Sequence, residues 1–287
     1  MANNNQRAES TAHTVKLHRS IGLAKRPRKR LPRQVPPTMI AQEYARALLA
    51  YVQQLRVTFQ PLLSVLPQLL QSAANDKRID AGEGARVRQL MGGIRERMSK
   101  TLPDHDLEAL AQKFAARTST QQKIQFSKQL RAALGVDVTV TDRNLSALFE
   151  AFVNANVSLI KDIGTKLASD VESTVLRGVQ NGTLHTDIAK ELQDKFDFSE
   201  NRAKLIARDQ VGKFYGQVNA SRQQSLGVNQ FTWRTVKDER VRDEHAELEG
   251  ETFSYDDPPN GELPGEAINC RCYAEPVLDQ ILALTDE

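Results

Sequence analysis

Apolar side chains recur at steps of three and four residues over most of the chain, from residue 38 to about residue 227. That spacing places them along one face of a helix and leaves polar residues on the other. We expect a first helix from Thr38 that is broken or kinked at Pro61 and Pro67, because proline cannot continue the helical hydrogen-bond pattern. Three further helices should follow before residue 140, the last ending at Gly135 as a C-terminal cap. The predicted buried faces carry Leu48, Tyr51, Val52, Leu55 and Phe59, then Val87, Leu90, Met91, Ile94 and Met98, then Leu107, Leu110 and Phe114, and finally Ile124, Leu130 and Leu134.

The longest predicted helix covers residues 142–181, with Asp142 as its N-cap. Unbroken, it would be a rod of about 55 to 60 Å at the usual helical rise, and Gly164 leaves room for a bend. A short helix, "DIAKELQDKF", should come next, and then a longer one capped by Ser199 and Gly227. A helix as long as the first is typical of a scaffold or an interaction strut.

At residue 228 the apolar period changes from helical spacing to alternation. Phe231, Trp233 and Thr235 alternate with polar neighbours, which indicates a half-buried strand. A loop rich in proline and glycine and a second strand-like run, "INCRCYAEPV", follow. The predicted fold class is therefore mainly α, a helical body with a long central helix plus a small C-terminal α+β domain. We divide the chain into a disordered basic arm (1–37), a helical bundle region (38–140), a long helix with further helices (141–227) and the small α+β unit (228–287).

Composition adds that the chain resembles a soluble globular protein, since 40% of its residues are hydrophobic and 26% are charged. No stretch reaches the roughly 18 to 20 consecutive apolar residues of a membrane-spanning helix, and the N-terminus lacks the apolar core of a secretory signal. Two cysteines cannot form the disulfide framework of a small secreted domain. We therefore expect no membrane partner and a reducing cytoplasm as the compartment of synthesis.

Charge is strongly segregated along the chain, although the net charge is only +3. Residues 1–33 contain nine basic residues and one acidic residue, whereas residues 228–287 contain five basic and fifteen acidic ones. The basic arm could neutralise DNA phosphates without reading sequence, in a salt-sensitive way, or it could be a tail whose charge only aids solubility. The candidate DNA-contacting residues are Lys25, Arg26, Arg28, Lys29, Arg30 and Arg33.

Both cysteines lie in one C-x-C element, Cys270 and Cys272. On a strand their side chains would share a face, with Arg271 pointing the other way. They could bind a soft metal together with His245 and a carboxylate such as Asp238, form a redox pair, act as a reactive thiol, or pack as small apolar residues. Asp238 lies seven residues before His245, so the two would share a face if the segment were helical. The motifs of serine hydrolases, P-loops, zinc proteases and dinucleotide-binding folds are absent from the sequence.

The order of these residues resembles the MuF-type phage head morphogenesis proteins, the minor capsid family named after the F protein of phage Mu. The resemblance covers roughly residues 165–277 and includes the helical segment "RAKLIAR" before the tryptophan strand. The residues that carry it are Arg202, Arg208, Trp233, Asp238, Arg240, Arg242, His245, Gly250, Asn269, Cys270, Arg271 and Cys272.

The resemblance implies a protein of the virion or procapsid, made in the bacterial host cytoplasm, that acts in head assembly at or near the portal. Its expected partners are the portal protein, capsid or scaffold proteins, and packaged double-stranded DNA. No enzymatic activity and no cofactor are expected, with zinc as the alternative. One alternative function is control of genome packaging or ejection through DNA binding. Another is a metal-dependent hydrolase or nuclease centred on Asp238, His245, Cys270 and Cys272.

Overall fold

A computed structural model of the protein describes residues 17–18, 31–75, 81–101, 103–135, 137–138, 140, 142 and 145–283. A short strand, β1 (Leu17–His18), pairs antiparallel with β2 (Asp137–Val138). The predicted DNA-contacting residues from Lys25 to Arg30 lie outside the described residues, and Arg33 is exposed. None of the described helices is both long enough and apolar enough to cross a membrane.

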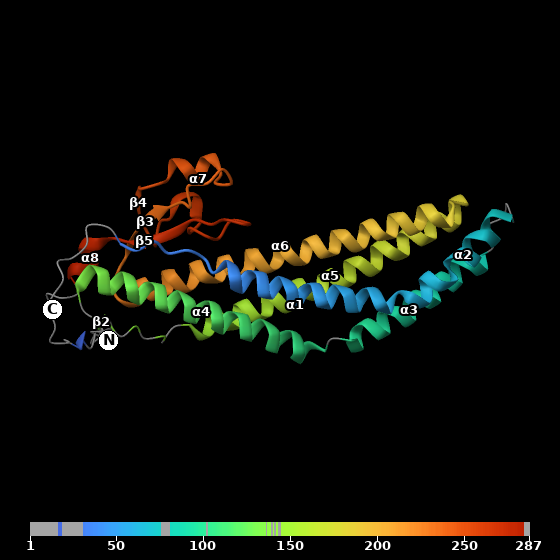
Figure 1. The fold of residues 1–287 in the computed structure, drawn as a ribbon, viewed down its shortest axis with the longest axis horizontal. Coiled ribbons are helices and arrows are strands. Elements are labelled where there is room, and N and C mark those ends of the chain that lie inside the picture. Colours follow the sequence, from blue (N-terminus) through green and yellow to red (C-terminus); the bar gives the residue numbers. More distant parts are fainter. Residues whose placement is uncertain are drawn as a thin grey trace, which may run out of the picture.

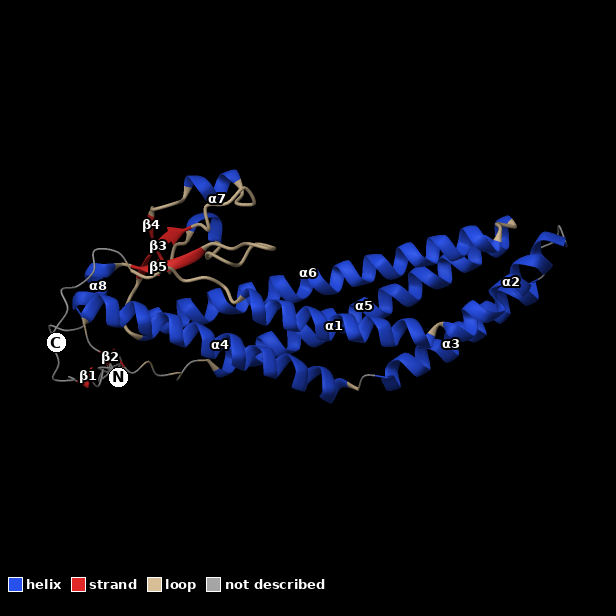
Figure 2. Ribbon diagram, in the orientation of Figure 1, coloured by secondary structure: helices blue, strands red, loops and turns tan. Residues whose placement is uncertain are grey.

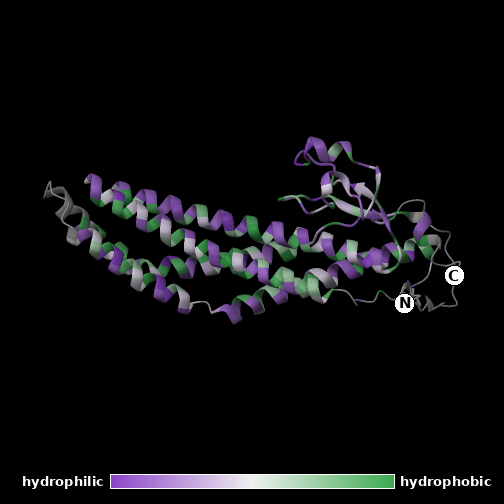
Figure 3. Ribbon diagram, turned by 180° about the vertical axis from the view of Figure 1, so that it is seen from behind, coloured by the Kyte–Doolittle hydropathy of each residue, from purple (hydrophilic) through white to green (hydrophobic). Residues whose placement is uncertain are grey.

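Long helices lying side by side make an elongated body, and a small unit of strands sits on one flank near one end (Figures 1 and 2). The structure therefore confirms the predicted fold class, mainly α with a small α+β unit at the C-terminus. Along the helices, hydrophobic stretches alternate with hydrophilic ones (Figure 3), as amphipathic packing requires. The helices of the body are α1 (Thr38–Thr58), α2 (Gln60–Asn75), α3 (Ala81–Thr101), α4 (Asp104–Leu134), α5 (Ser146–Asn181) and α6 (His185–Ser225).

One hydrophobic core runs through this body, from Ile40 on α1 to Val218 on α6. It includes a buried tyrosine, Tyr44, whose ring stacks on Phe114 at 4.5 Å and whose hydroxyl donates a hydrogen bond to Asn156 Oδ1. Helices on both sides of residue 140 thus share one core. A buried polar group inside it is satisfied, as burial away from water requires.

Two predicted helix ends are wrong, because each pair of helices is a single continuous helix. The polar stretch after Phe114 lies within α4, and the predicted break before Ser199 lies within α6. Ser199 is no cap; it is buried in mid-helix, and its hydroxyl donates to the Lys195 carbonyl of the preceding turn. Neither polar run contains glycine or proline. Each run packs against neighbouring helices, so the helix continues through it.

Pro67 also fails to end its helix, since it lies inside α2. Leu62, Leu66 and Leu69 are buried on either side of it, so apolar burial offsets the lost hydrogen bond. Gly164 produces no break in α5. It marks a close approach instead, because a Cβ atom there would lie 2.9 Å from the Tyr51 hydroxyl of α1.

Asp142 and Ile124 differ from their predicted roles as well. Helix α5 begins at Ser146, and Asp142 accepts hydrogen bonds from Arg222 and Lys123 rather than capping a helix. Ile124 is 44% exposed, because α4 turns a polar row that includes Gln122 toward its neighbours. Among the predicted caps, Gly135 does end its helix in the left-handed conformation.

The C-terminal unit is a three-stranded antiparallel sheet of order β4-β3-β5. Its strands are β3 (Gln230–Arg234), β4 (Thr252–Ser254) and β5 (Tyr273–Pro276), and it carries α7 (Asp243–Glu247), a 3-10 turn (Pro259–Gly261) and α8 (Leu278–Ala283). In the register Phe231 faces Phe253 on one side and Pro276 on the other. A separate small core of mostly aromatic and sulfur side chains supports the sheet.

Buried amide side chains attach this unit to the body. Asn219 and Gln223 of α6 both donate to the Ala274 carbonyl of β5, at 2.8 and 2.9 Å. Gln122 of α4 donates in turn to Asn219 Oδ1 at 2.8 Å. Helices α4 and α6 and strand β5 are therefore joined by one hydrogen-bonded network, which holds the start of β5 against α6.

The prediction of disorder up to residue 37 is wrong for residues 31–37, which are extended and packed on the helical body. Gln34 is fully buried and donates to Gln129 at 2.6 Å, and the Val35 backbone exchanges two hydrogen bonds with Gln125. The prolines that exclude a helix here still permit an extended segment, whose backbone groups find partners on α4.

Candidate functional site

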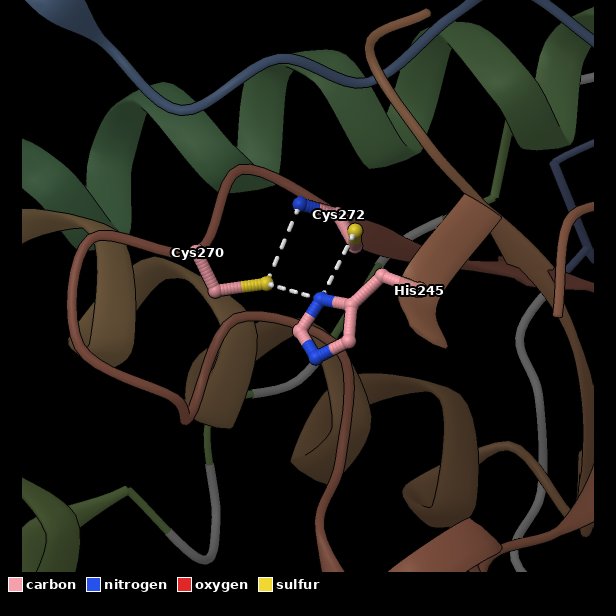
Figure 4. Close-up of side chains that lie close together, drawn as sticks. All are labelled: His245, Cys270 and Cys272. Carbon is pink, nitrogen blue, oxygen red and sulfur yellow. Dashed lines mark hydrogen bonds between the residues drawn. The ribbon is translucent and has the colours of Figure 1, made fainter. Parts of the chain in front are cut away.

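The structure brings His245, Cys270 and Cys272 together, although 24 residues separate the histidine from the first cysteine. His245 comes from α7, and the cysteines precede β5. The Nδ1 atom of His245 lies 3.4 Å from Cys270 Sγ and 3.6 Å from Cys272 Sγ, with the ring edge turned toward both sulfurs (Figure 4). All three side chains are buried.

The cysteines reach this position from a turn, not from the strand that the sequence predicts. Asn269 has a positive φ of 58°, and the Cys270 N–H donates to the Ala267 carbonyl. The Cys272 N–H then donates to Cys270 Sγ at 3.4 Å. The two thiols lie together while Arg271 pairs with Asp238, as expected, but the cysteines lie in an irregular segment between this turn and β5 rather than on a strand.

Trp233 of β3 positions the histidine ring. The two rings meet edge to face with their centroids 5.3 Å apart, and Trp233 is 2% exposed. An aromatic contact of this geometry stabilises a pair beyond its buried area, so the imidazole is held in one orientation. The tryptophan strand is thus connected physically to the C-x-C element.

The two thiols are electrostatically coupled. A hydrogen bond from Cys272 stabilises the Cys270 thiolate against the opposing effect of burial and lowers the pKa of Cys270 to about 5. The same hydrogen bond, together with burial, raises the pKa of Cys272 far above its ordinary value. The two pKa shifts are thus opposite in direction, and the lowered pKa of Cys270 favours the thiolate that metal binding and thiol chemistry use.

A pocket of about 160 Å³ opens beside the thiols. Four arginines line it: Arg208, Arg240, Arg242 and Arg271. Arg208 donates to the Asn269 amide oxygen and Arg242 to the Ile268 carbonyl, both at 2.8 Å, so these two charges have neutral partners. The pocket is therefore positively charged and suits an anionic group.

Asp238 does not face His245, so the predicted pairing of these two residues is wrong. The segment between them is not helical until Asp243, and Asp238 accepts a hydrogen bond from Arg271 at 2.5 Å. That guanidinium lowers the pKa of Asp238 below its ordinary value. The carboxylate is thereby removed both from a catalytic pair and from the group of metal-binding atoms.

The other predicted residues lie nearby in structural roles. Arg202 pairs with Asp162 of α5, and Gly250 has a positive φ of 92° in the turn before β4. Sequence reasoning missed Asp209, whose carboxylate accepts the Asn269 N–H at 2.8 Å and so ties the cysteine turn to α6. It also missed Arg222, a buried arginine that looks in the sequence like one more residue of a solvated helix face.

Comparison with known families finds that residues 169–275 match the family described as "Phage Mu protein F like protein". Residues 169–275 are therefore similar to that family, and we call this stretch the Mu F-like domain. The predicted resemblance is confirmed, and the match runs from the second half of α5 through α6 into β5. The Mu F-like domain is thus the hairpin of the two longest helices together with the strand unit and its His-Cys-Cys group.

Several curated proteins are similar to the chain, and three of them are described here. An uncharacterized protein of Haemophilus influenzae is 30% identical over 240 residues, which cover 82% of this chain and 54% of the relative. The uncharacterized protein YqbB of Bacillus subtilis is 28% identical over 167 residues, which cover 48% of this chain and 54% of the relative. The NAD(+)--arginine ADP-ribosyltransferase EFV of Enterococcus faecalis is 26% identical over 131 residues, which cover 40% of this chain and 27% of that protein.

The chain spans about half the length of the first two of these relatives. No solved structure matches it.

Proposed function

We propose that the protein is a phage minor capsid protein that acts in procapsid assembly at or near the portal, through contacts with portal, capsid or scaffold proteins. The observation that carries this proposal is the Mu F-like domain at residues 169–275, because that family is one of phage head morphogenesis. As a component of the virion or procapsid, the protein would be made in the cytoplasm of the bacterial host.

The shape of the body supports a role in protein contacts. A bundle of helices up to 41 residues long offers a stiff, extended surface for such contacts. Phe198 and Leu205 are 53% and 38% exposed and lie two turns apart on α6, and Leu184 is 67% exposed at its start. Exposed apolar side chains on one helix are suited to burial against a partner protein.

The basic arm supplies an auxiliary contact with packaged double-stranded DNA in this proposal. Its charge from Lys25 to Arg33 favours binding to phosphates without sequence preference. The second candidate function, control of genome packaging or ejection by DNA binding, rests on the same charge. The third, a metal-dependent hydrolase or nuclease, lacks the Asp238–His245 pair on which it depended, because Asp238 accepts a hydrogen bond from Arg271 instead.

Quantitative mass spectrometry of purified procapsids and virions tests the assembly role. We expect the protein in both or in procapsids, in few copies per particle, and we expect a phage that lacks its gene to form defective heads. Normal heads without the protein, and its absence from both kinds of particle, would refute the proposal.

Removal of residues 1–30 separates the first two functions. If the arm is auxiliary, the shortened protein still enters procapsids but binds DNA more weakly and with a shallower salt dependence. A matched control keeps the length of the arm and replaces its Lys and Arg residues by Ser. Unchanged DNA affinity and salt dependence in both variants would remove the DNA-binding alternative and leave the assembly role untouched.

A further inference from the structure

We propose that His245 Nδ1, Cys270 Sγ and Cys272 Sγ bind one zinc ion, whose fourth coordination position opens into the pocket lined by arginines. This inference is independent of the assembly role, since it concerns what closes the C-terminal unit. Thiolates and imidazole are the ligands that structural and catalytic zinc sites use most. Within the described residues these three form the group of metal-binding side chains whose ligand atoms all lie within 4.8 Å of one another.

The distances are those of a tetrahedral zinc site. Zinc at about 2.3 Å from sulfur and about 2.0 to 2.1 Å from nitrogen holds a sulfur ligand and a nitrogen ligand about 3.5 Å apart. The two observed separations from His245 Nδ1 are 3.4 and 3.6 Å. One ring nitrogen has a single proton or a single lone pair, so it can make a hydrogen bond to only one of the sulfurs at a time. Both sulfurs converge on it, which a shared cation explains.

The surroundings hold the ligands in place. Trp233 orients the imidazole ring, the Cys272 N–H donates to Cys270 Sγ, and Asp209 anchors the turn at Asn269. Contacts of this kind around the ligands orient metal sites and raise their affinity. The donors also come from two separate elements, so a bound ion would connect α7 to the start of β5. A unit with so small a core gains most from such a connection.

The charge balance points to an anion at the fourth position. A zinc ion with two thiolates and a neutral imidazole has no net charge, so the nearby arginines do not repel it. Arg208 and Arg242 have neutral partners and remain available to attract a negative group in the pocket. A carboxylate is therefore a better fourth ligand here than the water molecule that an uncharged pocket would provide.

Metal analysis of the full-length protein tests the site. The protein is purified under reducing conditions without chelator, in medium with zinc, and its metal content is measured by inductively coupled plasma mass spectrometry. We expect about one zinc ion per chain, and a loss of most of it in His245→Ala, Cys270→Ser and Cys272→Ser. The matched control is His105→Ala, because His105 is 78% exposed on α4 and distant in sequence from the site; its zinc content should equal that of the wild type.

Cobalt(II) substitution of the wild-type protein tests the site without relying on variants, which could fail to fold. Thiolate-to-cobalt charge-transfer absorption and the intense visible bands of tetrahedral cobalt are expected, and acetate as the probe anion should shift the visible bands. Wild-type protein that contains no zinc and gives no thiolate–cobalt absorption would overturn the proposal, as would a Cys270–Cys272 disulfide in the freshly purified protein. Visible bands that acetate leaves unchanged would overturn the open, anion-accepting position.

Discussion

Arg222 is a buried cation that joins three parts of the body, and its removal should destabilise the fold more than the loss of any surface ion pair. It is 1% exposed on α6 and donates to the Ser119 carbonyl, to Ser119 Oγ and to Gln122 Oε1, at 2.8, 2.9 and 2.5 Å. It also donates to Asp142 Oδ1 at 2.8 and 3.0 Å. One guanidinium thus satisfies buried acceptors on α4 and holds the segment that leads to α5.

The magnitude follows from the acceptors that Arg222→Met would leave behind. Methionine keeps most of the apolar stem, so little cavity forms. Gln122 Oε1 and Ser119 Oγ would each lose a donor in a buried position, at about 1 to 3 kcal/mol for each group. Asp142 is 41% exposed and can be hydrated, so the loss of its hydrogen bonds from Arg222 adds little. We expect a decrease of about 2 to 6 kcal/mol in the free energy of unfolding.

Urea unfolding followed by circular dichroism measures this difference. The matched control is Arg177→Met, which removes a surface pair with Glu191 in which Arg177 is 54% exposed, and which should cost at most about 1 kcal/mol. The variants are compared by the shift in the urea concentration at the unfolding midpoint, with the dependence of the unfolding free energy on urea concentration unchanged. If Arg222→Met and Arg177→Met unfold at the same urea concentration, the assignment of Arg222 as a required buried connection is refuted.

Three further outcomes are expected. Gly216→Ala should lower stability by about 1 to 3 kcal/mol in urea unfolding, because its Cβ would lie 2.8 Å from the Pro264 carbonyl. The control Gly212→Ala makes only ordinary contacts and should be neutral or stabilising. Equal effects of the two substitutions would contradict the close approach at Gly216. Tyr44→Phe should cost about 1 kcal/mol by the same assay, and an unchanged midpoint would argue against its buried hydrogen bond. Burial raises the pKa of Asp142, but hydrogen bonds from Arg222 and Lys123 outweigh it and lower the pKa. The ionised carboxylate therefore stabilises the fold above its ordinary pKa, and this stabilisation is lost as the pH falls through the lower pKa of the folded state. The free energies of unfolding of wild type and Asp142→Asn should differ near pH 7 and converge in acid. A difference that stays constant with pH would contradict the coupling.

Local patterns in the sequence predict the helix content, the change to strands and the family resemblance. Apolar spacing identified α1, α3 and α5, because residues three and four apart share a helical face whatever packs against it. Alternation around Trp233 identified β3 for the same kind of reason. The ordered series from Arg202 to Cys272 pointed to the Mu F-like domain without any knowledge of contacts.

Contacts between distant segments decided the rest. Whether a polar stretch ends a helix or lies buried within one depends on the partner that faces it, and Ser119, Gln122 and Ser199 all lie inside helices. Likewise, spacing suggested that Asp238 would face His245, but the turn between them directs the carboxylate to Arg271. The cysteines meet the histidine only because α7 and the segment before β5 pack together beside Trp233. Short-range periodicity can be read from the sequence. Which distant residues come together in a site depends on the path of the backbone in three dimensions.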